Sequence, residues 1–190
     1  LNNDGIHTTS LANSNVMFDN DNNGISEHMA WSDGKDGFLV LDLNKDGIIN
    51  NGSELFGSGT TLVNGSKAKD GYEALKQYDD NYDNVIDMND SIFEKLQIWI
   101  DKNVDGITTD DELKSLKDLN VKSLNLSSEN STQIDNGNLI GLVSNYTKID
   151  DTKGEMVDVW FATQPSEIKP VVVYNAPVVI EEEKIQTVTF

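Results

Sequence analysis

The 190-residue sequence lacks cysteine and arginine and has only three prolines. It also has no apolar run of the roughly 18 residues that a membrane-spanning helix needs. Without cysteine there is no disulfide framework, thiolate metal site or cysteine nucleophile. The 14 lysines face 33 acidic residues, which gives a net charge of -19. A field of this sign excludes binding to nucleic-acid phosphates and to anionic membranes. The first residues are neither basic nor apolar, so we expect no signal peptide.

This acidity opposes compaction, because like charges repel one another. Two features nevertheless favour folding: hydrophobic residues make up 37% of the chain, and Trp31, Trp99 and Trp160 are spread along it. Disordered chains of low hydrophobicity usually lack such residues. We therefore expect a folded domain whose negative charge is neutralised by a cation. The spacing of the acidic residues indicates which cation.

Four segments share one acidic pattern, in which Asp stands at position 1 and Asp or Asn at positions 3 and 5. A turn residue and an aliphatic residue follow at positions 6 and 7. The segments begin at Asp19, Asp42, Asp79 and Asp101. The start of the chain, residues 1–6, resembles the same motif without its first Asp, so we expect a fragment of a longer protein. Clusters of Asp, Asn and Gly are common in ordinary turns, but turns alone do not explain the repeated register.

The register matches an EF-hand-like calcium loop. Calcium binds about 6–8 oxygen ligands, supplied by side chains at positions 1, 3 and 5, the carbonyl at position 7 and an acid at position 12. Glycine at position 6 permits the sharp turn. We expect the aliphatic side chain at position 7 to point into the core. The sequence therefore predicts several bound Ca²⁺ ions as the cofactor.

Three of the loops are nearly complete. The Asp101 loop meets every requirement, with Glu112 at position 12. In the Asp42 loop the closing acid, Glu54, falls at position 13, so we expect one extra residue. In the Asp79 loop Asn84 replaces the glycine, and Asn tolerates a left-handed backbone. The predicted ligands are Asp101, Asn103, Asp105, Ile107, Thr109 and Glu112; Asp42, Asn44, Asp46, Ile48, Asn50 and Glu54; and Asp79, Asn81, Asp83, Val85, Asp87 and Asp90.

The other two segments are less complete. The Asp19 loop has no acid at position 12 and carries Glu27 at position 9, so we predict a partial site there. The segment at residues 1–6 is incomplete. The predicted ligands of these two segments are Asp19, Asp21, Asn23, Asn2 and Asp4.

Alternation and turn signals predict six strands, at residues 13–18, 38–41, 97–100, 121–126, 139–148 and 155–161. Capping residues and apolar spacing predict a helical turn and three helices, at residues 53–57, 70–78, 88–96 and 110–119. We therefore expect an α+β fold, in which short calcium-loop helices pack beside a small antiparallel sheet and hairpin. We assign residues 1–163 to this domain, and the proline-containing residues 164–190 to a tail that leads to the next module.

The order and spacing of these segments resemble the self-processing module of large RTX proteins, the FrpC type. The resemblance covers about residues 1–163 and is carried by residues 1–6, 37–57, 70–87, 99–113 and 144–148. It implies calcium-triggered cleavage of an Asp-Pro bond at the N-terminal edge of the module, and joining of the released Asp to a lysine amine as an isopeptide bond. It also implies type I secretion to the surface or surroundings of a Gram-negative bacterium.

None of the three prolines follows Asp, so we expect the scissile bond upstream of Leu1. The expected partners are that upstream segment and a lysine amine of the same or a neighbouring protein, and we expect a monomer. The proton donor stays unassigned. Asp4, His7, Tyr146 and Lys148 are the polar candidates, although each also suits a ligand, turn or surface role.

Two other functions remain open. A non-catalytic calcium-binding spacer of a large secreted adhesin would contain the same loops. The Asp79 and Asp101 loops start 22 positions apart, which suits the tandem calcium repeat of a dockerin-like interaction module, but dockerins are shorter and mostly helical. An Asp-Pro bond just upstream would separate the self-processing module from the spacer. The sequence has no HExxH or GxSxG motif of an ordinary hydrolase.

Overall fold

The computed structural model describes residues 4–164, and β-strands dominate this part of the chain. Eleven strands form three antiparallel sheets within it. The expectation of an α+β fold with calcium-loop helices is therefore wrong. Among residues 4–164 the single α-helix is α1 (Gly71–Lys76), which has six residues. Two short 3-10 helices, η1 (Leu11–Asn13) and η2 (Phe93–Lys95), accompany it.

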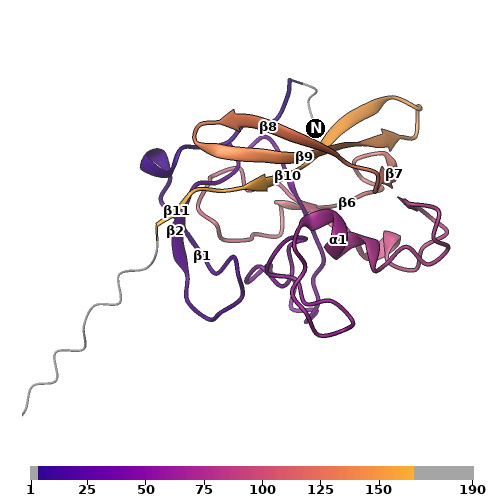
Figure 1. Cartoon of the computed structure of the whole chain (residues 1–190), viewed down its shortest axis with the longest axis horizontal. Helices are drawn as coiled ribbons and strands as arrows, with labels where there is room; N and C mark the ends of the chain where they lie inside the picture. The colour runs from indigo at the N-terminus through magenta and orange to yellow at the C-terminus, as the bar shows by residue number, and fades with distance from the viewer. Residues whose placement is uncertain (1–3, 165–190) are drawn as a thin grey trace, which may run out of the picture.

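The largest sheet has five strands. Its order is β10 (Lys153–Trp160), β9 (Asn138–Lys148), β7 (Val121–Asn125) and β4 (Val85–Ile86), with β8 (Glu129–Asp135) also paired to β9. In Figure 1 the long strands β8, β9 and β10 form a layer along one side of the molecule, and α1 and the loops lie on the other side. This sheet therefore forms one side of the molecule, and α1 together with the loops (the loop region) forms the other side.

Two smaller sheets have three strands each. The first pairs β1 (Val16–Phe18), β2 (Glu27–Met29) and β11 (Thr163–Gln164), and the second pairs β3 (Phe38–Val40), β5 (Gln97–Trp99) and β6 (Leu113–Ser115). Gln164, the first residue of the expected tail, thus pairs with His28. The rest of that tail, residues 165–190, lies outside the described residues.

The β3–β5–β6 sheet separates two hydrophobic clusters, because successive residues of a strand face opposite sides. On β5, Ile98 packs in a cluster with Leu75 of α1 and Leu124 of β7. The next residue, Trp99, packs in the other cluster with Trp31. Both tryptophans are fully buried, and their ring centroids lie 5.6 Å apart. Strand β5 therefore contributes one side chain to each of the two hydrophobic clusters.

The structure confirms a strand in each of the six expected segments, although most of these strands are shorter than expected. Helix α1 is also confirmed, because Asp70 is its N-cap and accepts a hydrogen bond from Glu73 N at 2.7 Å. The strands β2, β4, β6, β8 and β11 were not predicted.

Three predicted helical segments are wrong. Within 88–96 only the 3-10 helix η2 forms. Within 110–119, Leu113–Ser115 pairs with β5 as β6, and the apolar residues divide between the two cores, since Leu113 packs in the second cluster and Leu116 in the first. Within 53–57, Leu55 forms an isolated bridge to Val40. In 110–119 and 53–57, strand pairing with a distant segment overrides local helix propensity.

Candidate functional site

The four acidic loops share one backbone conformation with two left-handed residues. Position 6 is left-handed as expected, with φ between 64° and 88° at Gly24, Gly47, Asn84 and Gly106. Position 4 is also left-handed, which the sequence did not predict, with φ between 55° and 62° at Asn22, Lys45, Tyr82 and Val104. Both turns bring backbone N–H groups back toward the first Asp of each loop.

The Asp at position 1 accepts hydrogen bonds from these N–H groups. Asp101 accepts from Asp105 N at 3.2 Å and from Gly106 N at 2.8 Å. The Asp79 and Asp19 loops repeat this pair of bonds at positions 5 and 6. Asp42 accepts from Lys45 N at 2.7 Å and Gly47 N at 2.9 Å. The carboxylate at position 1 therefore stabilises the turn of each loop by accepting hydrogen bonds from its backbone N–H groups.

Positions 3 and 5 are joined to each other in every loop. In the Asp101 loop the Asn103 amide donates to the Asp105 carboxylate at 2.8 Å, and that carboxylate accepts from Ile107 N at 2.8 Å. Equivalent bonds join Asn44 to Asp46, Asn81 to Asp83 and Asn23 to Asp21. The bond from position 7 recurs at Ile48, Val85 and Ile25. The predicted side-chain ligands therefore lie together.

The closing acids bond to the same two backbone positions in three loops. Glu112 accepts from Lys102 N at 3.0 Å and Thr109 N at 3.1 Å, which are positions 2 and 9. Asp90 accepts from the equivalent Asp80 N and Asp87 N at 2.8 and 2.9 Å. Glu54 does so from Leu43 N and Asn50 N at 3.1 and 2.8 Å. Glu54 at position 13 therefore takes the place of the usual acid at position 12.

The expectation that position 7 points into the core is wrong. The side chains of Ile48 and Ile107 are 44% and 63% exposed. The following residue is buried instead: Ile49 is 2% exposed and Thr108 is 8% exposed. Position 8 therefore anchors these loops, and the position-7 side chain points outward, as that of Ile25 does at 49% exposure.

Several loop acids are buried and have no lysine partner among the residues that the structure describes. Asp79, Asp90, Asp101, Glu54 and Glu112 are each at most 4% exposed. The ion pairs found among residues 4–164 instead join lysines to Asp33, Glu73, Asp111 and Asp151. Burying a charge is costly unless it is paired or bound to a metal. These all-oxygen, acidic sites therefore fit a hard divalent cation such as Ca²⁺.

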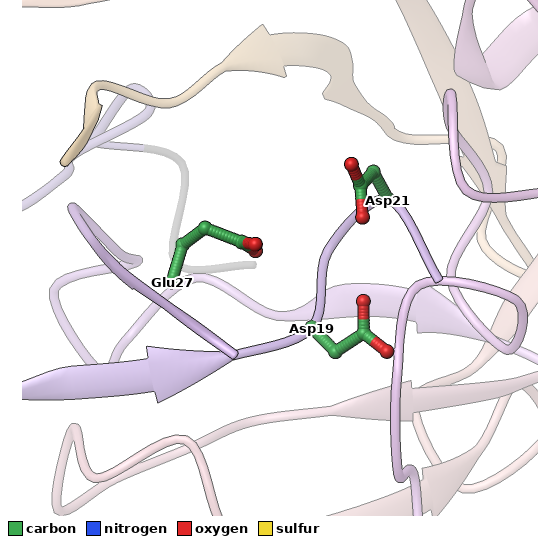
Figure 2. A group of neighbouring side chains, drawn as sticks. All are labelled: Asp19, Asp21 and Glu27. Atoms are coloured by element: carbon green, nitrogen blue, oxygen red, sulfur yellow. The ribbon is translucent and has the colours of Figure 1, made fainter. Parts of the chain in front are cut away.

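The Asp19 loop gains a third acid from a neighbouring strand. Figure 2 shows the carboxylates of Asp19, Asp21 and Glu27 around a common space, and they lie within 4.8 Å of one another. Burial raises the pKa of Glu27, and the negative charges of Asp21 and Asp19 raise it further. Within the described part of the chain, this is the one group of three His, Cys, Asp or Glu residues with ligand atoms so close.

The incomplete first segment has no comparable cluster in the part that the structure describes. Asp4 is exposed, and its main-chain carbonyl oxygen accepts a hydrogen bond from His7 Nε2 at 3.2 Å. The other predicted ligand there, Asn2, lies outside the described residues. Of the remaining proton-donor candidates, Tyr146 is buried within β9 and Lys148 ends that strand.

Comparison with known proteins assigns the family. The model of the SPM domain matches residues 1–162. The chain belongs to the SPM domain family. This confirms its resemblance to the self-processing module of RTX proteins. The protein "Iron-regulated protein FrpA" of Neisseria meningitidis serogroup C is 42% identical over 164 residues, which cover 85% of this chain and 15% of that relative. The chain therefore spans a small part of the relative's length.

One contact in this SPM domain joins an acidic loop to the hydrophobic core. Trp31 Nε1 donates to Asp101 Oδ2 at 2.8 Å, and both side chains are fully buried. The two residues are 70 positions apart, so no local pattern predicts the contact. None of the helices among residues 4–164 has the length and apolar composition needed to cross a membrane.

A cavity of about 420 Å³ lies between the loop region and the large sheet of the SPM domain. Its walls include parts of β3, α1, β9 and β10, together with Ile6–Thr8. Its polar residues include Asp158, whose carboxylate accepts from Gly71 N at 2.7 Å. Burial raises the pKa of Asp158 to about 6, and the charge of Asp70 adds to this effect. No pattern in the sequence predicts the cavity or the role of Asp158 in its wall.

Proposed function

We propose that this SPM domain is a calcium-dependent autocatalytic module. It cleaves an Asp-Pro bond just upstream of residue 1 and joins the released Asp to a lysine amine of the same or a neighbouring protein. Family membership supports self-processing. The calcium dependence rests on one observation: the acidic loops bury carboxylates that have no lysine partner among residues 4–164, most completely at Asp101.

The side chains proposed to hold Ca²⁺ are the ligands that the loop register predicts. In the Asp101 loop they are Asp101, Asn103, Asp105 and Glu112, with the carbonyl oxygen of Ile107 and with Thr109. The Asp42 and Asp79 loops offer equivalent sets that end at Glu54 and Asp90, and Asp19, Asp21 and Glu27 form a further group. Bound Ca²⁺ would supply the positive charge that offsets buried carboxylates, and so would order the domain.

Calcium binding has enough free energy to act as a folding switch. At about 1 mM calcium, a site with Kd of about 10–100 μM stabilises the folded state by about 1.4–2.7 kcal/mol. A few such sites supply much of the roughly 5–15 kcal/mol that stabilises a typical domain. We therefore expect an expanded state in low calcium and an ordered one at extracellular calcium levels.

The proposed chemistry uses a nucleophile that is already tethered. The side-chain carboxylate of the upstream Asp attacks its own main-chain carbonyl and closes a five-membered anhydride, a reaction favoured by high effective molarity. Proline is a suitable leaving group, because twisting its amide removes the resonance that protects a peptide bond. The anhydride then reacts with water or with an unprotonated lysine amine.

We also infer that the domain is carried by a secreted protein of a Gram-negative bacterium. The source of the matching relative, Neisseria meningitidis, supports this inference. Its partners in the reaction are the chain's own upstream segment and a lysine amine, and we propose that the domain acts as a monomer.

The deciding experiment restores the natural residues that precede residue 1, about ten of them, and records intact mass with and without millimolar calcium. Calcium-dependent loss of a segment ending in Asp, which leaves an N-terminal Pro, supports self-cleavage. A heavier Asp–Lys-linked product supports ligation. The same protein with the scissile Asp replaced by Asn is the control, since it keeps the chain length but removes the nucleophile.

A calcium-binding structural spacer is the second candidate function, because the loop geometry alone would serve it equally well. The same experiment separates the two. If calcium produces the near-UV circular dichroism signal of a folded protein but the mass does not change, the domain is a spacer. Identical far-UV and near-UV spectra in EDTA and in calcium would contradict both functions.

A further inference from the structure

The side chain of Trp31 holds one of the proposed calcium ligands in place. Its Nε1 donates to Asp101 Oδ2 at 2.8 Å, and the same oxygen accepts from Gly106 N at 2.8 Å. Both the indole and the Asp101 carboxylate are fully buried. A hydrogen-bond donor outside the metal's own ligands orients a metal-binding carboxylate and tunes its affinity. The indole N–H therefore has the position of such a donor.

The backbone of the same residue holds the N-terminal segment, residues 7–9. Trp31 N donates to Thr9 Oγ1 at 2.9 Å, and the Trp31 carbonyl oxygen accepts from Thr9 N at 2.8 Å. The contact continues along the chain, because Asp33 N donates to the His7 carbonyl oxygen at 3.2 Å. Trp31 thus contacts an acidic loop through its side chain and the N-terminal segment through its backbone.

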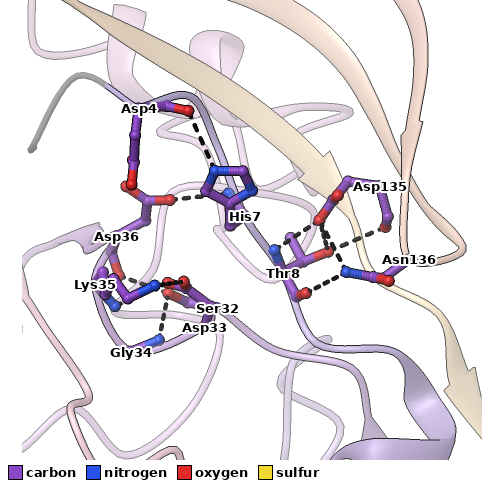
Figure 3. A network of polar contacts seen from close by, with 10 residues as sticks. All are labelled: Asp4, His7, Thr8, Ser32, Asp33, Gly34, Lys35, Asp36, Asp135 and Asn136. Atoms are coloured by element: carbon purple, nitrogen blue, oxygen red, sulfur yellow. Dashed lines mark hydrogen bonds and ion pairs between the residues drawn. The ribbon is translucent and has the colours of Figure 1, made fainter.

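The turn that follows this tryptophan makes a second contact between the two regions. Gly34 lies against the Asp101 loop, where an added Cβ atom would be 3.1 Å from the carbonyl oxygens of both Asp101 and Lys102. Two residues later, the Asp36 carboxylate accepts from His7 N at 2.9 Å (Figure 3). The turn therefore contacts both the Asp101 loop and the N-terminal segment.

The large sheet also holds the N-terminal segment. Asp135, the last residue of β8, accepts from Thr8 N at 2.7 Å (Figure 3), and the Asn138 amide of β9 donates to the Thr9 carbonyl oxygen at 2.9 Å. The segment is thus bonded both to the sheet and to the Trp31 region, and its contact with Trp31 links it to the Asp101 loop.

The Asp79 loop makes its contacts with a different part of the molecule. The carbonyl oxygen of Asn84, at position 6 of that loop, accepts from Leu126 N at 2.9 Å. Within the same loop, β4 pairs with β7 of the large sheet. Calcium binding at the Asp79 and Asp101 loops should therefore affect different regions.

We propose that Trp31 is a positioning residue that transmits calcium binding at the Asp101 loop to the N-terminal segment, close in sequence to the bond that is cleaved. The inference rests on the proposed function and names the calcium site that controls it. The cleaved bond lies about ten residues before Thr9, and a chain spans at most about 3.3–3.6 Å per residue. Fixing Thr9 therefore restricts the space that this bond can reach.

The coupling is electrostatic in origin. The carboxylates of Asp101, Asp105 and Glu112 belong to one loop, and like charges repel one another. Without a cation, this repulsion opens the loop, so the Trp31 indole loses its acceptor and the turn after it loses the surface on which it packs. With the repulsion offset by bound Ca²⁺, the loop closes against the indole N–H and the N-terminal segment is held.

The test compares two tryptophans of one hydrophobic cluster. Trp31→Phe removes the N–H that bonds to Asp101, whereas Trp99→Phe removes an N–H that has no partner among the described residues. Both side chains are fully buried, so the two changes remove similar packing. We expect the calcium Kd of the Asp101 loop to rise about 10–100-fold in Trp31→Phe, the usual effect of losing such a donor, and less than about threefold in Trp99→Phe.

NMR during a calcium titration separates a change at one site from a general loss of stability. The Gly106 amide reports on the Asp101 loop, and the Asn84 amide, at the equivalent position, reports on the Asp79 loop. In Trp31→Phe, the Gly106 amide should need about 10–100-fold more calcium and the Asn84 amide less than about threefold more. Equal shifts at both amides, or at Gly106 in the Trp31 and Trp99 variants, overturn the assignment of Trp31.

A second variant tests the coupling without changing the hydrophobic cluster. Glu112→Gln weakens the same calcium site directly. At a calcium concentration that fills the Asp79 loop, we expect hydrogen exchange at the Thr9 amide to become at least about tenfold faster. Exchange at the Leu126 amide, which bonds to the Asp79 loop, should change less than about threefold. Unchanged exchange at Thr9 would show that the N-terminal segment does not respond to this site.

Cleavage of the N-terminally extended protein adds a functional readout. The calcium concentration that gives half the maximal rate should follow the titration of the Gly106 amide and rise about 10–100-fold in Trp31→Phe. If it follows the Asn84 amide instead, the Asp101 loop is not the controlling site. If the unmodified protein does not cleave in calcium, the proposed function fails, and the Gly106 and Thr9 amides still decide whether Trp31 couples the two regions.

Discussion

The acidic loops and the cavity wall bury carboxylates in two different ways. Asp101 is fully buried, and it accepts hydrogen bonds from Trp31 Nε1, Asp105 N and Gly106 N. Asp158 on the cavity wall accepts one from Gly71 N, and burial raises its pKa to about 6. The loop environment thus supplies three hydrogen-bond donors to the Asp101 carboxylate, whereas burial on the cavity wall favours the neutral form of Asp158.

This difference separates two possible uses of an acid. A carboxylate that is held by N–H groups beside other acids suits a cation that binds all of them. A carboxyl group whose pKa lies near neutrality changes its protonation state within the physiological range. Substitutions in the two regions should therefore respond to different variables, calcium in the loops and pH in the cavity.

The largest expected effect comes from Asp101→Asn. This change keeps the size of the side chain but removes the charge that would face calcium. With saturating calcium, we expect a loss of about 3–5 kcal/mol in the free energy of unfolding, the usual cost of breaking a buried charge pair. Urea unfolding followed by circular dichroism measures it. The control is Asp111→Asn, which removes an exposed charge nearby and should change stability by less than about 0.5 kcal/mol. Equal losses in both variants would show that Asp101 holds no cation.

Asp158→Asn should give the next largest effect, with a pH dependence. The folded-state pKa of Asp158, about 6, lies above the ordinary value of 3.8, so the folded protein binds this proton more tightly than the unfolded one. The unmodified protein therefore gains stability as pH falls from about 7 to about 4. Above pH 7, the variant should be more stable by about 2–3 kcal/mol.

Both proteins are unfolded in urea at saturating calcium across this pH range. The difference between their free energies of unfolding reports on Asp158 alone, because the other acids are the same in both. We expect it to shrink as pH falls through 6 and to vanish near pH 4. A difference that stays constant with pH would contradict the raised pKa.

Glu112 and Glu27 allow a comparison between two of the acidic loops. Glu112 is 3% exposed and bonds to the backbone at both ends of its loop, whereas Glu27 approaches the Asp19 loop from β2 and is only half-buried. Isothermal titration should show calcium Kd raised about 10- to 100-fold at the affected site by Glu112→Gln. We expect Glu27→Gln to raise the Kd of its own site by less than about tenfold, because solvent screens a half-buried charge. The reverse order would show that the Asp19 loop is the dominant site.

The smallest expected effect concerns the left-handed residue at position 4. Asn22 is exposed with φ of 55°, and a left-handed backbone costs an ordinary residue about 1–2 kcal/mol. Asn22→Val should therefore lower stability by about 1 kcal/mol, and Asn22→Gly should change it by less than about 0.5 kcal/mol. Thermal unfolding in calcium measures both. If Asn22→Val has no effect, Val104 at the equivalent position of the Asp101 loop carries no strain either.

The loops could be predicted because their interactions are local. Each set of side chains and the backbone N–H groups that they accept from lie within 13 residues, so the pattern 1-3-5-6 contains most of the information. The spacing from Asp42 to Glu54 also predicts the one extra residue in that loop. The same holds for α1, whose N-cap Asp70 and apolar face are adjacent in sequence.

The expected helix at 110–119 shows where local reasoning stops. Leu113, Leu116 and Leu119 have helical spacing, yet β5 offers strand pairing at Leu113–Ser115, and two separate cores receive the leucines. Strand β8 is a similar case, because Glu129–Asp135 is polar and largely exposed, and it gives no apolar alternation. It forms a strand because β9 provides hydrogen-bond partners along its edge.

The sequence alone determined the acidic loops, their register, their likeness to the self-processing module and the absence of cysteine chemistry. The tertiary structure decided that the domain is mostly β, that position 8 rather than position 7 enters the core, and that Tyr146, Asp36 and Asp158 border one cavity. The physical reason is the range of the interactions. A loop closes on its own backbone, whereas a strand pair, a core and a cavity need partners from distant parts of the chain, which one linear pattern does not specify.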